Sequence, residues 1–152
     1  MVSVEVPPNF PIQPCVIEAV VQQQLPLGVF LSIAKQEGGR VGQSVPNRSA
    51  RDGRVWSFDH GPMQINDYSW STRVQKTFGV SMQQVRDDLC LNARVGAWIF
   101  RQAINDAKGN VWHGVAYYHS RNPQFANSYM WKVWGHYQRI EPEIRRLGWV
   151  GQ

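Results

Sequence analysis

The chain has 152 residues and a formal net charge of +5, from 16 Lys and Arg against 11 Asp and Glu. This length suits one domain with its own core, and the charge favours an anionic partner such as nucleic acid, acidic lipid or an anionic wall polymer. The basic residues are scattered, which argues against a nucleic-acid stripe, and the apolar runs are far shorter than the roughly 18 residues of a membrane span.

The N-terminal third contains two predicted helices. Residues 1–14 hold four prolines and are expected to form an extended lead-in, with no visible signal peptide. Apolar positions then predict a helix over residues 15–24. Pro26 suits the first turn of a second helix, whose buried face includes Ile33 and which should end at the glycine pair that begins with Gly38.

The stretch from residue 40 to residue 60 has a different character. Pro46, Asn47 and two glycine-containing turns interrupt it, and its apolar alternation is short. We therefore expect a small, irregular β lobe, with strands around residues 40–43 and 54–58.

The remaining chain is predicted to be helical. A helix begins at residue 67 and ends at Gly79, and a capping box with Ser and Gln three residues apart starts a short helix at residue 81. Three longer helices follow, over residues 89–108 after Asp88, over 111–119 after Asn110, and over 125–137 with Tyr129, Val133 and Trp134 facing inward. A partial helix and a loose end are expected for residues 139–152, because of Pro142 and two glycines.

These elements predict a mainly α, lysozyme-like α+β fold. We expect one globular domain of six to seven helices, with a small β-hairpin lobe bordering a cleft. The predicted boundaries are an N-terminal lead-in over residues 1–14, the domain over residues 15–140 and a C-terminal extension over residues 141–152.

The first candidate for chemistry is a carboxylate at a helix end. Glu37 follows Ile33 by four residues, so it lies on or beside the apolar face, where desolvation raises the pKa of a carboxyl group. The two glycines after it leave space for a ligand to approach the backbone. A Glu at a helix end is more often a cap or an ion-pair partner, so the neighbouring motifs decide its role.

Two further stretches have side chains suited to sugar recognition. The Gly61-Pro62 pair forces a tight turn, and Gln64 and Asn66 place amides there that can bind sugar hydroxyl and acetamido groups. Asn66 is also a candidate helix cap, and both roles are compatible. In the second stretch a Tyr hydroxyl at position 118 can orient a carboxylic acid.

Other site types find no support in the sequence. His119 follows the tyrosine, but a lone His is more often structural. There is no Ser-His-Asp spacing, no HExxH and no glycine-rich phosphate loop, and the histidines lack metal-ligand spacing with the cysteines. We predict no metal and no cofactor. Cys15 and Cys90 are either free and buried or paired across about 75 residues.

Together these motifs resemble the lytic transglycosylase family with a lysozyme-like domain. The match is nearest to the specialised type associated with secretion systems, conjugation or pili, and it covers residues 15–133. It depends on four motifs in the family's order, namely Ala34-Lys35-Gln36-Glu37, Asp59-His60-Gly61-Pro62-Met63-Gln64-Ile65-Asn66, Cys90-Leu91-Asn92 with Val95-Gly96-Ala97, and Tyr118-His119-Ser120.

The chain departs from the family pattern in three places. Gly38 stands where the family usually has Ser, which removes a hydroxyl that would touch the sugar. The tyrosine motif continues His119-Ser120-Arg121 where the family has Asn-Ala-Gly. The β lobe carries an insertion around residues 45–56. These departures affect fine specificity more than the type of reaction.

The resemblance implies a periplasmic or cell-envelope lyase that acts on peptidoglycan glycan strands. It would cleave the β-1,4 bond between N-acetylmuramic acid and N-acetylglucosamine, close a 1,6-anhydro ring and use no cofactor. Glu37 is the implied catalytic acid, and the implied substrate contacts are Gly38, Met63, Gln64, Asn66, Tyr118 and His119. A Cys15–Cys90 disulfide and a secretion, conjugation or pilus machine as partner are also implied.

Three alternatives stay open. A hydrolytic, lysozyme-type muramidase needs a second carboxylate in the β lobe, and Asp52 and Asp59 are the candidates. A non-catalytic wall-binding module for secretion assembly would keep the fold for contact alone. A nucleic-acid binder depends only on the net charge.

Overall fold

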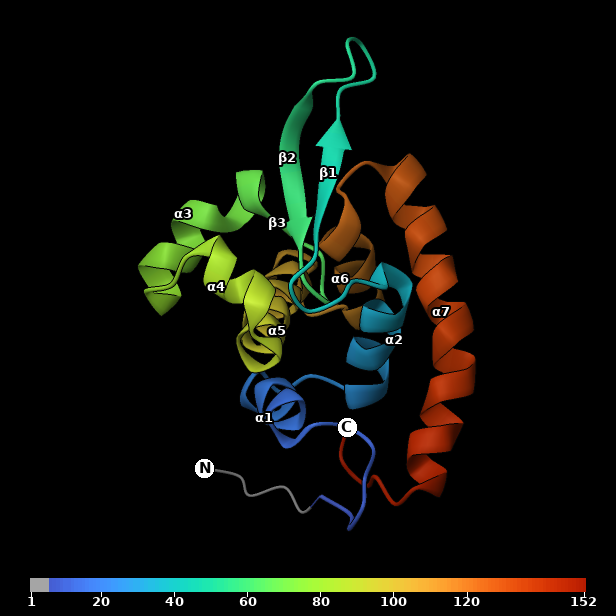
Figure 1. The fold of residues 1–152 in the computed structure, drawn as a ribbon. Helices are drawn as coiled ribbons and strands as arrows, with labels where there is room; N and C mark the ends of the chain where they lie inside the picture. Colours follow the sequence, from blue (N-terminus) through green and yellow to red (C-terminus); the bar gives the residue numbers. More distant parts are fainter. Residues whose placement is uncertain (1–5) are drawn as a thin grey trace. The chain divides into compact units, whose positions relative to one another are not determined.

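A computed structural model describes residues 6–152, so the part of the expected lead-in over residues 1–5 lies outside the described residues. The protein is mainly helical, with 61% helix, seven helices and one three-stranded antiparallel sheet over the described chain, which confirms the predicted α+β class (Figure 1). Its contacts form two compact units. The helical unit combines the chain up to residue 36 with residues 97–152, and the lobe unit is residues 37–96.

The helical unit consists of α1, α2, the second half of α5, α6 and α7. Their bounds are Pro14–Gln22, Leu27–Glu37, Leu89–Asp106, Val111–His119 and Pro123–Arg146. Its core side chains include Val20, Phe30, Phe100 and Val133, each at most 1% exposed. Helices α6 and α7 pack side by side (Figure 1).

The C-terminal helix is longer than expected. We predicted its end near residue 137 and a separate partial helix after it, but α7 runs unbroken through Pro142 to Arg146. Proline lacks the amide that would bond the carbonyl of Gln138, and the helix continues because Ile144 beyond it is buried to 4% exposure. Tertiary packing therefore overrides a local helix breaker here.

The predicted loose end and one predicted core residue are also wrong. Trp149 is 3% exposed, and the Leu27 amide donates to the carbonyl of Gln152 over 2.9 Å, so the tail is docked onto the start of α2. Tyr129 and Val133 are buried as predicted, whereas Trp134 is 37% exposed.

The lobe unit contains the sheet, with strands β1 (Ser44–Arg48), β2 (Val55–His60) and β3 (Ile65–Asn66) in that spatial order. Helices α3 (Asp67–Phe78) and α4 (Met82–Asp87) follow. The first strand was predicted four residues too early, because Pro46 and Asn47 were interpreted as turn residues. Strand β1 is an edge strand, where the missing amide of a proline need not cost a ladder hydrogen bond.

The predicted helix caps are confirmed. The Asn66 and Asn110 side chains accept from the backbone amides of Ser69 and His113, both over 3.0 Å. Ser81 and Gln84 form the reciprocal capping box, and Gly79 ends α3 with φ 69°. Helix α5 ends at Asp106, two residues before the predicted end, and Asn122, predicted as part of a turn, caps α7.

Cys15 and Cys90 form a disulfide, as the family resemblance implied. Over residues 6–152 no single helix is both long and apolar enough to cross a membrane. Helices α1 and α2 reach that length and composition only when counted together, across a bend of 117°.

Candidate functional site

The centre of the candidate site is the turn of residues 61–64, which joins β2 to β3 in the lobe unit. Gly61 and Gln64 both have left-handed backbones, with φ 69° and 52°. The Gly61 carbonyl accepts from both the backbone and the side-chain nitrogen of Gln64, each over 3.0 Å. The predicted tight turn is present, and Gln64 stays half-buried at its end.

Asn92 of α5 fixes this turn from within the lobe unit. Its side chain is fully buried and makes three hydrogen bonds: it accepts from the Met63 amide over 2.8 Å and donates to the carbonyls of His60 and Val85 over 3.0 and 3.1 Å. Gly61 is required beside it, because a Cβ there would lie 2.3 Å from the Asn92 nitrogen. The motif around Asn92 thus supports the turn.

Met63 packs beneath the turn. Its side chain is 2% exposed and lies against Gly96, where an added Cβ would approach the Met63 Cγ to 2.8 Å. The family resemblance implied a substrate contact for Met63. The structure gives it a supporting position, in which Gly96 provides the space and Met63 fills it.

The end of α2 meets the same turn through Gly39. A Cβ at Gly39 would lie 2.0 Å from the Gly61 carbonyl oxygen and 2.6 Å from the Gln64 side-chain nitrogen. Only a glycine permits this approach of backbone to backbone. Glu37, the last residue of α2, therefore lies two residues before the chain's contact with the Gly61–Gln64 turn.

The backbone explains the departure at position 38. Gly38 is exposed and has φ 65°, in the left-handed region where a serine would be strained. The helix ends here and the chain turns toward Gly39. Glu37 itself is half-buried. The left-handed backbone at position 38 therefore explains why this chain has glycine there.

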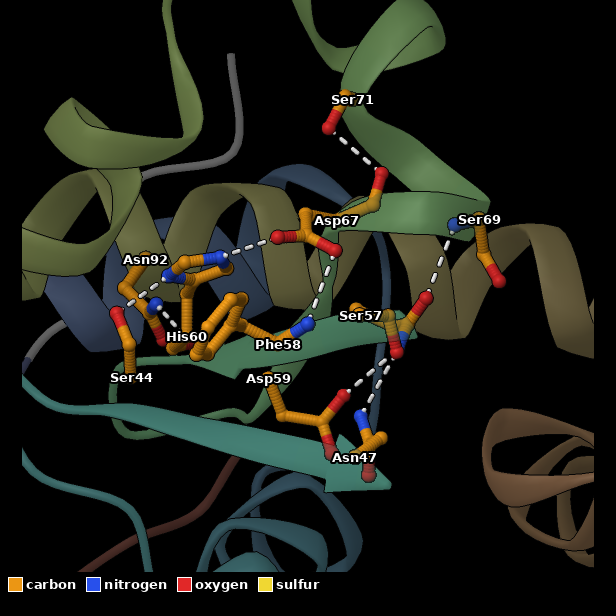
Figure 2. A network of polar contacts seen from close by, with 11 residues as sticks. Ser44, Asn47, Ser57, Phe58, Asp59, His60, Asp67, Ser69, Ser71 and Asn92 are labelled. Carbon is orange, nitrogen blue, oxygen red and sulfur yellow. Dashed lines mark hydrogen bonds and ion pairs between the residues drawn. The ribbon is translucent and has the colours of Figure 1, made fainter. Parts of the chain in front are cut away.

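One face of the sheet carries a polar cluster around Asp59. The Asn66 amide donates to Asp59 and to the Ser57 hydroxyl, each over 2.9 Å, and the Asn47 amide donates to Ser57 over 3.0 Å (Figure 2). These side chains share a face because Asp59 opposes Asn66 and Asn47 opposes Ser57 in the ladder. Both polar atoms of the Asn66 side chain thus form hydrogen bonds within the lobe unit: the oxygen accepts from the Ser69 amide, and the nitrogen donates to Ser57 and Asp59.

His60 of β2 is the centre of a chain of hydrogen bonds that was not predicted from the sequence. His60 contacts the Ser44 hydroxyl over 2.9 Å through Nδ1 and the Asp67 carboxylate over 3.0 Å through Nε2 (Figure 2). Burial raises the pKa of Asp67, but hydrogen bonds from the Phe58 amide and from His60 outweigh it and leave that pKa below its usual value. The only sequence signal for these contacts is that His60 follows Phe58 by two residues, so the two side chains share one face of β2.

This chain of contacts has a structural role. His60 is 8% exposed, both of its ring nitrogens are engaged, and it links β1 to the first turn of α3. The Asp67 carboxylate also accepts from the Phe58 amide over 3.0 Å. The contacts therefore hold the hairpin against α3, which keeps the Asp59 face of the sheet in place.

The tyrosine motif belongs to the helical unit. Tyr118 is half-buried and meets Phe100 edge-on, with ring centroids 6.4 Å apart. His119 is exposed and stacks on Tyr129 at 4.5 Å with an interplanar angle of 7°. The contribution of Tyr118 and His119 to a site around Glu37 stays a prediction.

The two candidate second carboxylates differ in their surroundings. Asp52 lies in the exposed connection between β1 and β2, where it accepts from the Arg54 amide over 3.0 Å. Asp59 lies within the ordered polar face of the sheet. The structure therefore retains Asp59 as the candidate and gives Asp52 a role in the hairpin loop.

Among the described side chains no three His, Cys, Asp or Glu gather as a metal site. Comparison with known proteins finds no matching family model and no matching curated protein.

Proposed function

We propose that the protein is a peptidoglycan lytic transglycosylase. The observation that carries the proposal is the packing of Gly39 onto the Gly61–Gln64 turn, which brings the end of α2 with Glu37 to a half-buried amide. Gly39, two residues after the first motif shared with the lytic transglycosylases, thus packs on the second motif, and the motif around Asn92 and Gly96 supports that turn.

In the proposed reaction a single carboxyl group acts twice. Glu37 in its acid form donates a proton to the oxygen between N-acetylmuramic acid and N-acetylglucosamine as that bond breaks. The 2-acetamido group assists at C1. The Glu37 carboxylate then takes the proton of the muramic C6 hydroxyl, whose oxygen closes the 1,6-anhydro ring. Protons and oxygens balance without water.

The chain's other residues bind and orient the strand in this proposal. The Gln64 amide has the donor and acceptor groups to bind an acetamido or hydroxyl group. Gly38, being exposed and without a side chain, leaves the backbone accessible beside Glu37. The family resemblance assigns the orientation of that carboxyl group to Tyr118 and the lining of a subsite to His119. The proposed setting is the periplasm or cell envelope, where the enzyme opens the wall locally for a secretion, conjugation or pilus machine.

The test is a digest of purified peptidoglycan sacculi, analysed by product mass. The wild-type protein should release 1,6-anhydro products, which are one water lighter than hydrolysed fragments. Glu37→Gln, which preserves side-chain shape but cannot donate the proton, should release none. Glu18→Gln on the exposed side of α1 is the matched control and should behave as wild type. Normal lysis by Glu37→Gln would contradict the assignment.

A hydrolytic muramidase is the second candidate, and the polar cluster around Asp59 favours it. Lysozyme-type hydrolysis uses a second carboxylate beside the acid. Asp59→Asn keeps an oxygen acceptor for the Asn66 amide and removes only the charge. If the enzyme is a transglycosylase, this variant keeps forming anhydro products. Reducing-end products that disappear in Asp59→Asn would establish hydrolysis instead.

A further inference from the structure

The helical unit has an apolar hollow of about 280 Å³ that the proposed reaction does not use. It is lined by Trp112 of α6 and by Met130, Trp131 and Trp134 of α7. Trp131 is 65% exposed and Trp134 is 37% exposed. We call these four residues the tryptophan groove. Large aromatic side chains gathered at a protein surface mark an interaction site.

Two of the three indole rings of the groove, those of Trp112 and Trp134, pack against each other and against Tyr137. The rings of Trp112 and Trp134 meet edge-on at 5.1 Å, and Tyr137 contacts both, at 5.3 Å from Trp112 and 5.6 Å from Trp134. These two rings therefore form an ordered wall of the hollow, and a ligand group that enters the hollow need not order them on binding.

The side chains next to the groove are uncharged or basic. Asn127 and Ser128 precede Trp131 by four and three residues, so they share its face of α7, and both are exposed. No Asp or Glu lies within four residues of any lining residue along the chain, whereas Lys132 directly follows Trp131 on α7. The surroundings thus suit a ligand with an apolar face, hydrogen-bonding groups and negative charge nearby.

Gly135 gives independent support. It follows Trp131 by four residues in the middle of α7, and a Cβ built there meets nothing within 4 Å. Packing therefore does not explain a glycine, which is unfavourable inside a helix compared with alanine. Its effect is to leave the helix surface bare beside Trp131, where a flat ring can lie.

We propose that the tryptophan groove is a second glycan-binding site, distinct from the residues assigned to cleavage, that holds an N-acetylhexosamine ring of a peptidoglycan strand. The apolar face of the ring stacks on Trp131, and the acetamido methyl enters the hollow beside Met130. Asn127 and Ser128 bond the ring hydroxyls, and Lys132 faces the carboxylates of the stem peptide. The choice of this occupant rests on the proposed function.

The test measures binding to purified sacculi by co-sedimentation, with Glu37→Gln as the parent so that no cleavage occurs. Trp131→Ala and Gly135→Gln, each added to that parent, should weaken binding at least tenfold. Gly135→Gln covers the bare helix surface with a better helix former, so the melting temperature should not fall. Trp56→Ala removes a tryptophan of the hairpin that is 56% exposed and should bind like the parent.

Binding by both groove variants at the strength of the parent would overturn the inference, even if the wild-type protein lyses walls. Conversely, wild-type protein that releases no wall fragments would overturn the proposed function without changing this readout. Two further arms test other occupants, using phosphatidylglycerol vesicles and sedimentation equilibrium of the protein alone. If Trp131→Ala weakens vesicle binding or self-association and leaves sacculus binding unchanged, the groove serves a membrane or a second copy instead.

Discussion

Replacing Asn92 with alanine should destabilise the lobe unit and impair lysis together. The substitution removes three hydrogen bonds at a fully buried position and leaves the Met63 amide and two carbonyls without that partner. At about 1 kcal/mol for each bond, the free energy of unfolding should fall by about 3 kcal/mol. In a chain of this size that corresponds to a melting temperature lower by roughly 6–12 °C.

Urea unfolding followed by far-ultraviolet circular dichroism measures this change, with the disulfide kept oxidised. Asn105→Ala on the same helix is the matched control. Its side chain is exposed, so its free energy of unfolding should stay within about 0.5 kcal/mol of wild type. If Asn92→Ala is destabilised by less than about 1 kcal/mol, the Asn92 bonds do not hold the Gly61–Gln64 turn.

Three further outcomes are expected. Gly39→Ala should cost about 1–3 kcal/mol and reduce lysis, because its Cβ collides with the Gly61 carbonyl; wild-type stability and activity would refute the close approach. Reducing the Cys15–Cys90 bridge, which closes about 75 residues, should remove about 4 kcal/mol of stability, and an unchanged melting temperature would refute that. The depressed pKa of Asp67 gives stability that is complete above about pH 4 and is lost at lower pH, so wild type should exceed Asp67→Asn at pH 6 and converge with it in acid; a constant difference would contradict this.

The sequence predicted the features that depend on neighbouring residues. The caps at Asn66, Ser81 and Asn110 need only a side chain and an amide three residues later, so their spacing is visible in the chain. The same holds for the end of α3 at Gly79 and for the turn at Gly61. The helix count and the position of the β lobe followed from these signals.

The errors occurred where distant parts of the chain decide the local structure. Pro46 fits a strand because β1 is at the sheet edge, and the local sequence does not show which strand is at the edge. Pro142 lies inside α7 because Ile144 beyond it is buried in the core. Trp134 follows the helical period of the core but is partly exposed at the groove.

The sequence motifs named the candidate site residues but did not predict the contacts that hold the Gly61–Gln64 turn in place. Glu37, Gln64 and Asp59 were named from their motifs. Gly39 packs on Gly61 of the turn, 22 residues away, and Asn92 holds the turn through Met63, 29 residues away. No rule of local spacing predicts contacts at these separations. The contacts of His60 with Ser44 and Asp67, 16 and seven residues away, were missed because they arise from the pairing of β1 with β2 and from the start of α3.

The central claim is that Glu37 cleaves peptidoglycan without water. The most direct measurement is the mass spectrum of fragments released from sacculi by wild-type protein and by Glu37→Gln under identical conditions. We expect 1,6-anhydro ends from the wild type and no fragments from the variant. Reducing ends from the wild type, or equal lysis by both proteins, would contradict it.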